Sequence, residues 1–187
     1  RWTEQIIHEE GQRFLGWREV PHEPNRIGKV ARSVMPAFKQ LFIARGKSTT
    51  PEDFNRKLFV IRKRLWNKVY TSTLNQKNFY YCCSLNSNTL IYKGQLMSEQ
   101  VDKFFPDLSQ ESLQSAIALV HSRYSTNTFP SWSLAHPYRL VAHNGEINTL
   151  RGNINWMHAR EKQFASSAFG EDISKVLPIV VPHGSDT

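Results

Sequence analysis

The chain has 187 residues, of which 40% are hydrophobic and 21% are charged, a balance typical of one globular domain of ordinary size. No apolar run approaches the roughly 20 residues that a membrane-spanning helix needs, and the first residues lack the pattern of a signal peptide. The formal net charge of +8 raises nucleic acid as a partner, although much of this charge falls in one predicted helix. The composition therefore predicts a globular domain without a membrane partner.

The first third of the chain predicts one helix and two strands. Residues 1–14 suit a helix with Gly11 near its end, and residues 15–20 suit the strand that follows it. Residues 37–44 carry apolar side chains on both faces, which predicts a strand buried within a sheet.

Thr50 starts the clearest helix, which should end near Lys68. Thr50 is a good N-cap, Pro51 suits the first turn, and Glu52 and Asp53 favour the positive end of the helix dipole. An apolar stripe has helical spacing: Phe54, Leu58, Ile61, Leu65 and Val69. The basic residues lie beside or opposite that stripe: Arg56, Lys57, Arg62, Lys63, Arg64 and Lys68. We interpret them as a solvated face in preference to a phosphate-binding surface.

The middle of the chain predicts a β-hairpin, with strands at residues 79–85 and 89–93 and a short turn at 86–88. Cys82 and Cys83 are adjacent in the first strand, where their side chains would point to opposite faces. We expect them to be reduced thiols, and no ligand cluster surrounds them to suggest a metal site. A short helix should follow at residues 98–104.

Two further strands, at residues 116–120 and 138–142, each end in polar residues, HSR after the first and HNG after the second. A strand that presents polar groups where it meets a loop is a common way to build a ligand site. Asn148 can cap the next helix, and residues 177–181 form a last apolar segment. Helices between strands predict an α+β or layered fold.

Arg123 lies just beyond the first of these strands, with the hydroxyl of Thr126 three residues later. A sheltered guanidinium can bind a carboxylate through two parallel hydrogen bonds. It can equally be a structural arginine paired with one of the 16 acidic residues. The residues alone leave both interpretations open.

Asn144 and Gly145 follow the second strand. Asn-Gly is most simply a turn, because both residues tolerate positive φ. The side-chain amide and the glycine N–H can also converge on a developing oxyanion. Together with Arg123, they suggest recognition of an amino-acid-like substrate and acyl-transfer chemistry.

Four histidines, His121, His136, His143 and His183, raise the hypothesis of a metal site or a general base. Their spacings match no metal-binding motif, and lone histidines are more often structural. The serines near the site stand in no GxSxG motif, which disfavours a serine hydrolase. We therefore predict no metal ligands.

The segments HSRYSTNTFPSW and HPYRLVAHNGEINTLRGNINWMHARE closely resemble the glutaminase domain of glutamate synthase large subunits, a class II glutamine amidotransferase. The stretches FNRKLFVIRKR, FYYCCSLNSNTLIYKG and HGSDT extend the resemblance over most of the chain. The resemblance implies an N-terminal-nucleophile hydrolase fold, an α+β layered αββα sandwich. Residues 1–187 would then be part of one such domain, truncated at both ends.

The resemblance also implies roles for single residues. Arg123 matches the arginine that binds the α-carboxylate of L-glutamine, and Thr126 matches a nearby hydroxyl position. Asn144 and Gly145 match the oxyanion-hole pair. Asp186, within HGSDT, matches the acid that holds the substrate α-amino group.

The family nucleophile, a cysteine at the mature N-terminus, has no counterpart in the sequence. Residue 1 is Arg1, and Cys82 and Cys83 lie inside the predicted hairpin. We expect the chain to be an internal segment of a longer protein and to lack glutaminase activity alone.

The resemblance implies a parent enzyme that combines glutamine-derived ammonia with 2-oxoglutarate, using FMN and a 3Fe-4S cluster outside these residues. Its electron donor would be ferredoxin, or a nicotinamide delivered through a reductase subunit. Richness in Lys, Asn, Phe and Tyr favours a ferredoxin-dependent plastid form in the chloroplast stroma over the bacterial cytoplasm. Two alternatives are another class II amidotransferase, for asparagine or amino-sugar synthesis, and a basic nucleic-acid-binding module.

Overall fold

The computed structural model of the chain describes residues 1–124, 128–145, 149–182 and 184. Its α-helices are α1 (Trp2–Glu9), α2 (Lys29–Ser33), α3 (Pro51–Tyr70), α4 (Val101–Phe104) and α5 (Leu150–Glu161). Its strands are β1 (Arg13–Glu19) and β2 (Lys39–Ala44). Short 3-10 helices are η1 (Pro24–Arg26), η2 (Lys77–Phe79), η3 (Ser98–Gln100), η4 (Pro106–Ser109) and η5 (Gly170–Val176). Within the described residues, no helix combines the length and the apolar character needed to cross a membrane.

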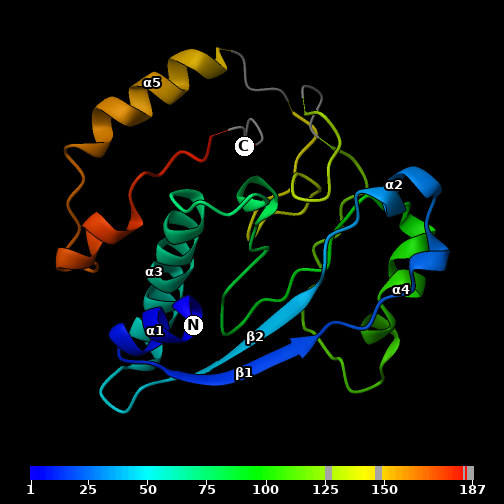
Figure 1. Cartoon of the computed structure of the whole chain (residues 1–187), viewed down its shortest axis with the longest axis horizontal. Helices are drawn as coiled ribbons and strands as arrows, with labels where there is room; N and C mark the ends of the chain where they lie inside the picture. The colour runs from blue at the N-terminus through cyan, green and yellow to red at the C-terminus, as the bar shows by residue number, and fades with distance from the viewer. Residues whose placement is uncertain (125–127, 146–148, 183, 185–187) are drawn as a thin grey trace.

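An antiparallel ribbon of β1 and β2 runs between two groups of helices, with α1 and α3 at one end and α2 and α4 at the other (Figure 1). Its register pairs Phe14 with Ile43 and Glu19 with Lys39. An irregularity falls between Phe14 and Gly16, where Gly16 has a φ of 140°, which glycine adopts without a Cβ clash. Both strands were predicted, but β2 is half exposed and not buried within a larger sheet.

Helix α3 forms as its N-terminal residues predict. The Thr50 hydroxyl accepts a hydrogen bond from the Asp53 N–H at 3.1 Å, Pro51 occupies the first turn, and the helix ends at Tyr70. Helix α1, which ends before Gly11 as predicted, packs against it. The first core cluster joins the two helices through Ile6, Ile7, Ile61 and Leu65, with Phe14, Leu41, Ile43 and Leu85 packed around them.

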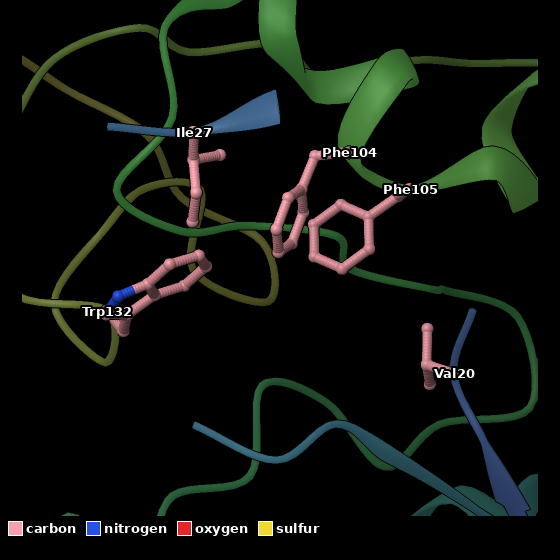
Figure 2. Packing of buried hydrophobic residues seen from close by; sticks show 5 residues of the cluster. All are labelled: Val20, Ile27, Phe104, Phe105 and Trp132. Carbon is pink, nitrogen blue, oxygen red and sulfur yellow. The ribbon is translucent and has the colours of Figure 1, made fainter. Parts of the chain in front are cut away.

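A second, aromatic core lies at the other end of the ribbon and contains Val20, Ile27, Phe104, Phe105 and Trp132. Figure 2 shows the Phe104 and Phe105 rings side by side, with Trp132 and Ile27 beyond them. The Phe104 and Phe105 centroids are 4.7 Å apart in an edge-to-face arrangement. Phe104 is the last residue, and Phe105 the next residue, of the short helix predicted at residues 98–104, which the structure forms as η3 and α4.

Four other predicted strands are wrong. In the described part of the chain, residues 79–85, 89–93, 116–120 and 138–142 form no strand, so the predicted hairpin is absent too. A strand needs a neighbouring strand to satisfy its backbone N–H and C=O groups. Within the described residues, β1 and β2 pair only with each other. Ile117 and Val120 are 84% and 82% exposed. The αββα sandwich is therefore not seen in these residues and stays a prediction.

Helix α5 begins after Thr149, whereas the predicted cap, Asn148, lies outside the described residues. In α5 no residue is buried, and Trp156 is 72% exposed. Figure 1 shows this helix standing apart from α3 and the ribbon.

Candidate functional site

The two segments predicted to form the site meet through their histidines. His136 stands between His121 and His143, with ring centroids 5.0 Å and 5.3 Å away. His121 comes two residues before Arg123, and His143 immediately precedes Asn144, so the structure brings the neighbours of both predicted binding residues together. Arg123, Asn144 and Gly145 are exposed.

Two predicted site residues, Thr126 and Asp186, lie outside the described residues, and so does His183. Their predicted roles therefore stay predictions. The roles of Arg123 and of the Asn144–Gly145 pair also stay predictions.

The predicted strand at 138–142 is instead a tight turn closed by two backbone hydrogen bonds. The Tyr138 N–H donates to the Val141 carbonyl at 2.8 Å, and the Val141 N–H donates back to Tyr138 at 3.2 Å. The Tyr138 hydroxyl donates to the carbonyl of Leu134. This turn carries the chain to His143 and the Asn-Gly pair.

Lys93 and Gly94 hold the segment before this turn in place. The buried ammonium of Lys93 donates to the Ser133 carbonyl at 2.7 Å and lies 4.5 Å from the centroid of the Tyr138 ring. Burial lowers the pKa of Lys93 from its ordinary value. Gly94 leaves room for Trp132, since a Cβ at position 94 would lie 2.2 Å from an atom of the indole ring.

The predicted oxyanion donor at Gly145 is already engaged. Its N–H donates to Nδ1 of His143 at 3.1 Å. For this N–H to bind a substrate oxygen, the His143 ring must turn away from it. His143, beside the Asn-Gly pair, thus occupies the N–H that the sequence predicts as an oxyanion donor, a contact that the sequence alone did not indicate.

Cys82 and Cys83 are free thiols in the structure, as expected. Burial raises the pKa of the Cys82 thiol to about 11 and also raises that of Cys83. The Cys82 thiol donates weakly to the Ser84 carbonyl. Both thiols are therefore protonated at neutral pH, and because the thiolate is the attacking species, neither suits a nucleophile.

No group of three or more metal-binding side chains that could hold a metal ion occurs among residues 1–124, 128–145, 149–182 and 184. His136 and its two ring neighbours, His121 and His143, are among these residues. The metal hypothesis raised by their number therefore gains no support from their arrangement.

Helix α3 does not present the solvated basic face that we expected. Lys63 is buried and donates to the Pro178 carbonyl at 2.6 Å. Lys57 and Arg64 both reach the buried carboxylate of Glu10, at 3.0 and 2.7 Å. Their partners lie in distant parts of the sequence, so helical spacing gave no signal of them.

Two surface cavities lie away from the predicted site. One, of about 420 Å³, lies between α1 and α3 and is lined by Trp2, Gln5, Ile6, Glu9, Arg64, Asn67, Lys68, Thr71 and Lys175. The other, of about 350 Å³, is lined by Val69, Leu74, Asn75, Gln76, Lys77 and Tyr80. Neither contains Arg123, Asn144 or Gly145.

The chain is similar to known proteins along its whole length. The family model described as glutamine amidotransferases class-II matches residues 1–187. A glutamate synthase [NADPH] large chain of Bacillus subtilis is 54% identical over 185 residues, which cover 97% of this chain and 12% of that protein.

Eukaryotic relatives are also similar. The glutamate synthase [NADH] of Schizosaccharomyces pombe is 44% identical over 98% of this chain and 9% of its own length. The ferredoxin-dependent glutamate synthase 1 of Arabidopsis thaliana, named as chloroplastic/mitochondrial, is 41% identical over 98% of this chain and 11% of its own. The chain thus spans about a tenth of the length of these relatives.

Proposed function

The chain belongs to the class II glutamine amidotransferases, and we propose that it is the glutamine-hydrolysing segment of a glutamate synthase. The observation that carries this proposal is the 54% identity over 97% of the chain to a protein named as a glutamate synthase large chain. The segment would release ammonia from L-glutamine, and the synthase domains of the longer protein would combine it with 2-oxoglutarate to form L-glutamate. The relatives described above are all named as glutamate synthases, which supports this acceptor over asparagine or amino-sugar precursors.

In this proposal, glutamine is bound and activated by residues close to the two segments that the histidine contacts bring together. Arg123 binds the α-carboxylate, Thr126 assists it, and Asp186 holds the α-amino group. The exposure of the Arg123 guanidinium, which has no ion pair within the described part of the chain, supports the first of these roles.

Asn144 and Gly145 form the proposed oxyanion hole. Attack of a thiolate on the side-chain amide carbon places negative charge on the amide oxygen, and two N–H donors stabilise that charge. Ammonia leaves when the tetrahedral intermediate collapses to a thioester, and water then releases glutamate. The His143 ring must move from Gly145 before this donor can act.

We assign the attacking thiolate to a cysteine outside these 187 residues. The chemical argument is the raised pKa of both Cys82 and Cys83, which keeps their thiols protonated. In the family pattern, a cysteine with a free α-amine acts as nucleophile and base together. The complete domain is proposed to be an αββα sandwich of the N-terminal-nucleophile hydrolase type, and the present chain alone would then be inactive.

For the longer protein we propose FMN and a 3Fe-4S cluster, with ferredoxin as electron donor in a plastid stroma. The compositional bias of the chain supports the plastid form. Relatives of the ferredoxin, NADH and NADPH types all match, and the bacterial NADPH-type chain has the higher identity of those compared, so similarity does not separate the donors.

Transfer of labelled nitrogen tests the proposal. The full-length protein is incubated with amide-labelled glutamine and 2-oxoglutarate, and either reduced ferredoxin or a reduced nicotinamide. We expect labelled α-amino nitrogen in glutamate, with ferredoxin as the more effective donor. Glutamine hydrolysis without labelled glutamate would contradict the synthase assignment, whereas faster turnover with NADPH would contradict only the donor.

A further inference from the structure

Most basic side chains of α3 lie against an oxygen acceptor. The acceptors are Asp53 for Arg56, Glu10 and Asp172 for Lys57, the Pro178 carbonyl for Lys63, and Glu9 and Glu10 for Arg64. Arg62 differs from these. Within the described residues its guanidinium has neither an ion pair nor a hydrogen bond, and its Nε atom is buried without a partner. A guanidinium carries five N–H donors, and buried donors in proteins are nearly always hydrogen-bonded. The environment of Arg62 is therefore unusual.

A second arginine lies against the same aromatic ring. The Cζ atoms of Arg62 and Arg139 are each 5.2 Å from the centroid of the Phe59 ring. Arg139 belongs to the turn between Tyr138 and Val141, so the ring joins α3 to the segment that leads to the Asn-Gly pair. No acid lies within ion-pair distance of either guanidinium in the described part of the chain.

Neither of the ionisable neighbours of Arg62 supplies the missing negative charge. Tyr80 and Cys82 lie near enough to interact with it electrostatically. Burial raises the pKa of Tyr80 and raises the pKa of Cys82 to about 11, so both groups are neutral at pH 7. Burial in turn lowers the pKa of Arg62, and the charge of Arg139 adds to this effect. Arginine nevertheless stays protonated in proteins, so two positive charges interact with one another, and within the described residues no acid is paired with either of them.

We propose that Arg62 and Arg139 form a binding site for a small oxoanion, either a phosphate or a carboxylate group. Two planar forks can each donate parallel hydrogen bonds to such a group, and the anion offsets their mutual repulsion. The site uses neither Arg123 nor Asn144 and therefore goes beyond the proposed glutamine site.

Calorimetric titration of the purified chain at low ionic strength tests this site, with inorganic phosphate in one arm and succinate in the other. We expect saturable binding at one site per chain in at least one arm. Arg62→Met and Arg139→Met should each weaken it about tenfold or more, because each removes a charge-assisted pair of hydrogen bonds. Arg56→Met is the matched control, since it removes the same charge from the same helix but from an arginine paired with Asp53.

Saturation by phosphate alone identifies phosphate carriers as ligands, and saturation by succinate alone identifies carboxylates. Absence of saturable binding in both arms overturns the proposal, as does an equal loss of affinity in the Arg56→Met control. If circular dichroism shows that Arg62→Met does not fold, Arg139→Met, which changes a half-buried turn residue outside any helix, decides alone. The titration needs no glutaminase activity, so its outcome is separate from that of the labelling experiment.

Discussion

Lys57 and Glu10, 47 residues apart in the sequence, form an ion pair in which Nζ lies 3.0 Å from Oε2 and the carboxylate is shielded from solvent. Arg64 and Lys175 reach the other carboxylate oxygen at 2.7 and 3.0 Å. A single buried acid therefore joins the end of α1 to α3 and to η5.

Glu10→Gln should lower the free energy of unfolding by about 2–4 kcal/mol, since it removes a buried charge and leaves three cations underpaired. Urea denaturation measures the change. Glu4→Gln, at an exposed position on the same helix, is the control and should change stability by less than about 0.5 kcal/mol. Equal stability of the two variants would show that the ion pairs contribute nothing net.

The same variant should alter the pH dependence of stability. Burial alone would raise the pKa of Glu10, but hydrogen bonds from Lys175, Lys57 and Arg64 outweigh it and the pKa lies below its ordinary value. A carboxyl group with a depressed folded pKa stabilises the protein above its ordinary pKa, and this contribution disappears as the pH falls through the folded value. The difference between wild type and Glu10→Gln should therefore shrink between pH 6 and about pH 3.

Lys63 should also make stability rise with pH, but in the alkaline range. Burial, reinforced by the charge of Arg62, lowers the pKa of Lys63 to about 8. The unfolded chain then binds more protons than the folded one between about pH 8 and pH 10, so stability rises with pH by up to about 3 kcal/mol. Lys63→Met should lack this rise. Urea denaturation midpoints of the wild type and of Lys63→Met at pH 7 and pH 9.5 measure this rise. An equal change of midpoint in both proteins would contradict the prediction.

Gly94→Ala should destabilise the aromatic core by about 1–3 kcal/mol, because the new methyl group meets the Trp132 ring. Gly28→Ala is the control. A Cβ at position 28 has no neighbour within 4 Å, so its effect should stay within about 1 kcal/mol. Comparable losses in both variants would mean that backbone freedom, and not the indole contact, sets the requirement for glycine.

Asn144→Ala in the full-length protein should lower glutaminase turnover by about 10²–10³, the usual effect of losing one oxyanion donor. The KM for glutamine should change little, because the interaction forms mainly in the transition state. Steady-state ammonia release measures both quantities. Unchanged turnover would remove Asn144 from the proposed site.

Arg123→Lys in the same protein should raise the KM for glutamine about tenfold while kcat changes little, since an ammonium cannot reproduce the two-pronged contact. Arg160→Lys, on the exposed surface of α5, is the matched control and should leave both constants unchanged. A fall in kcat alone at Arg123 would point to a role other than substrate binding.

Local sequence signals predicted the elements whose stabilising contacts are close in sequence. The Thr50 cap and the apolar stripe specified α3, and residue patterns placed β1 and β2 correctly. The strands predicted at residues 116–120 and 138–142 failed because a strand also depends on a neighbour that the local pattern does not reveal.

For the candidate site, the sequence identified the two segments but not what connects them. The contact of His136 with His121 and His143 depends on how the chain folds back between residues 121 and 143. The burial of Glu10 depends in the same way on Lys175, 165 residues away. The sequence shows which of these residues are charged, but it does not show which residues contact one another in the fold.

The β1–β2 ribbon places Phe14 and Ile43 in the first core, while Val20 and Phe38, just beyond its other end, belong to the aromatic core. A slip of one residue between the strands would turn the apolar side chains at both ends to the wrong face at once. The register of one two-stranded ribbon therefore sets the packing of both cores together.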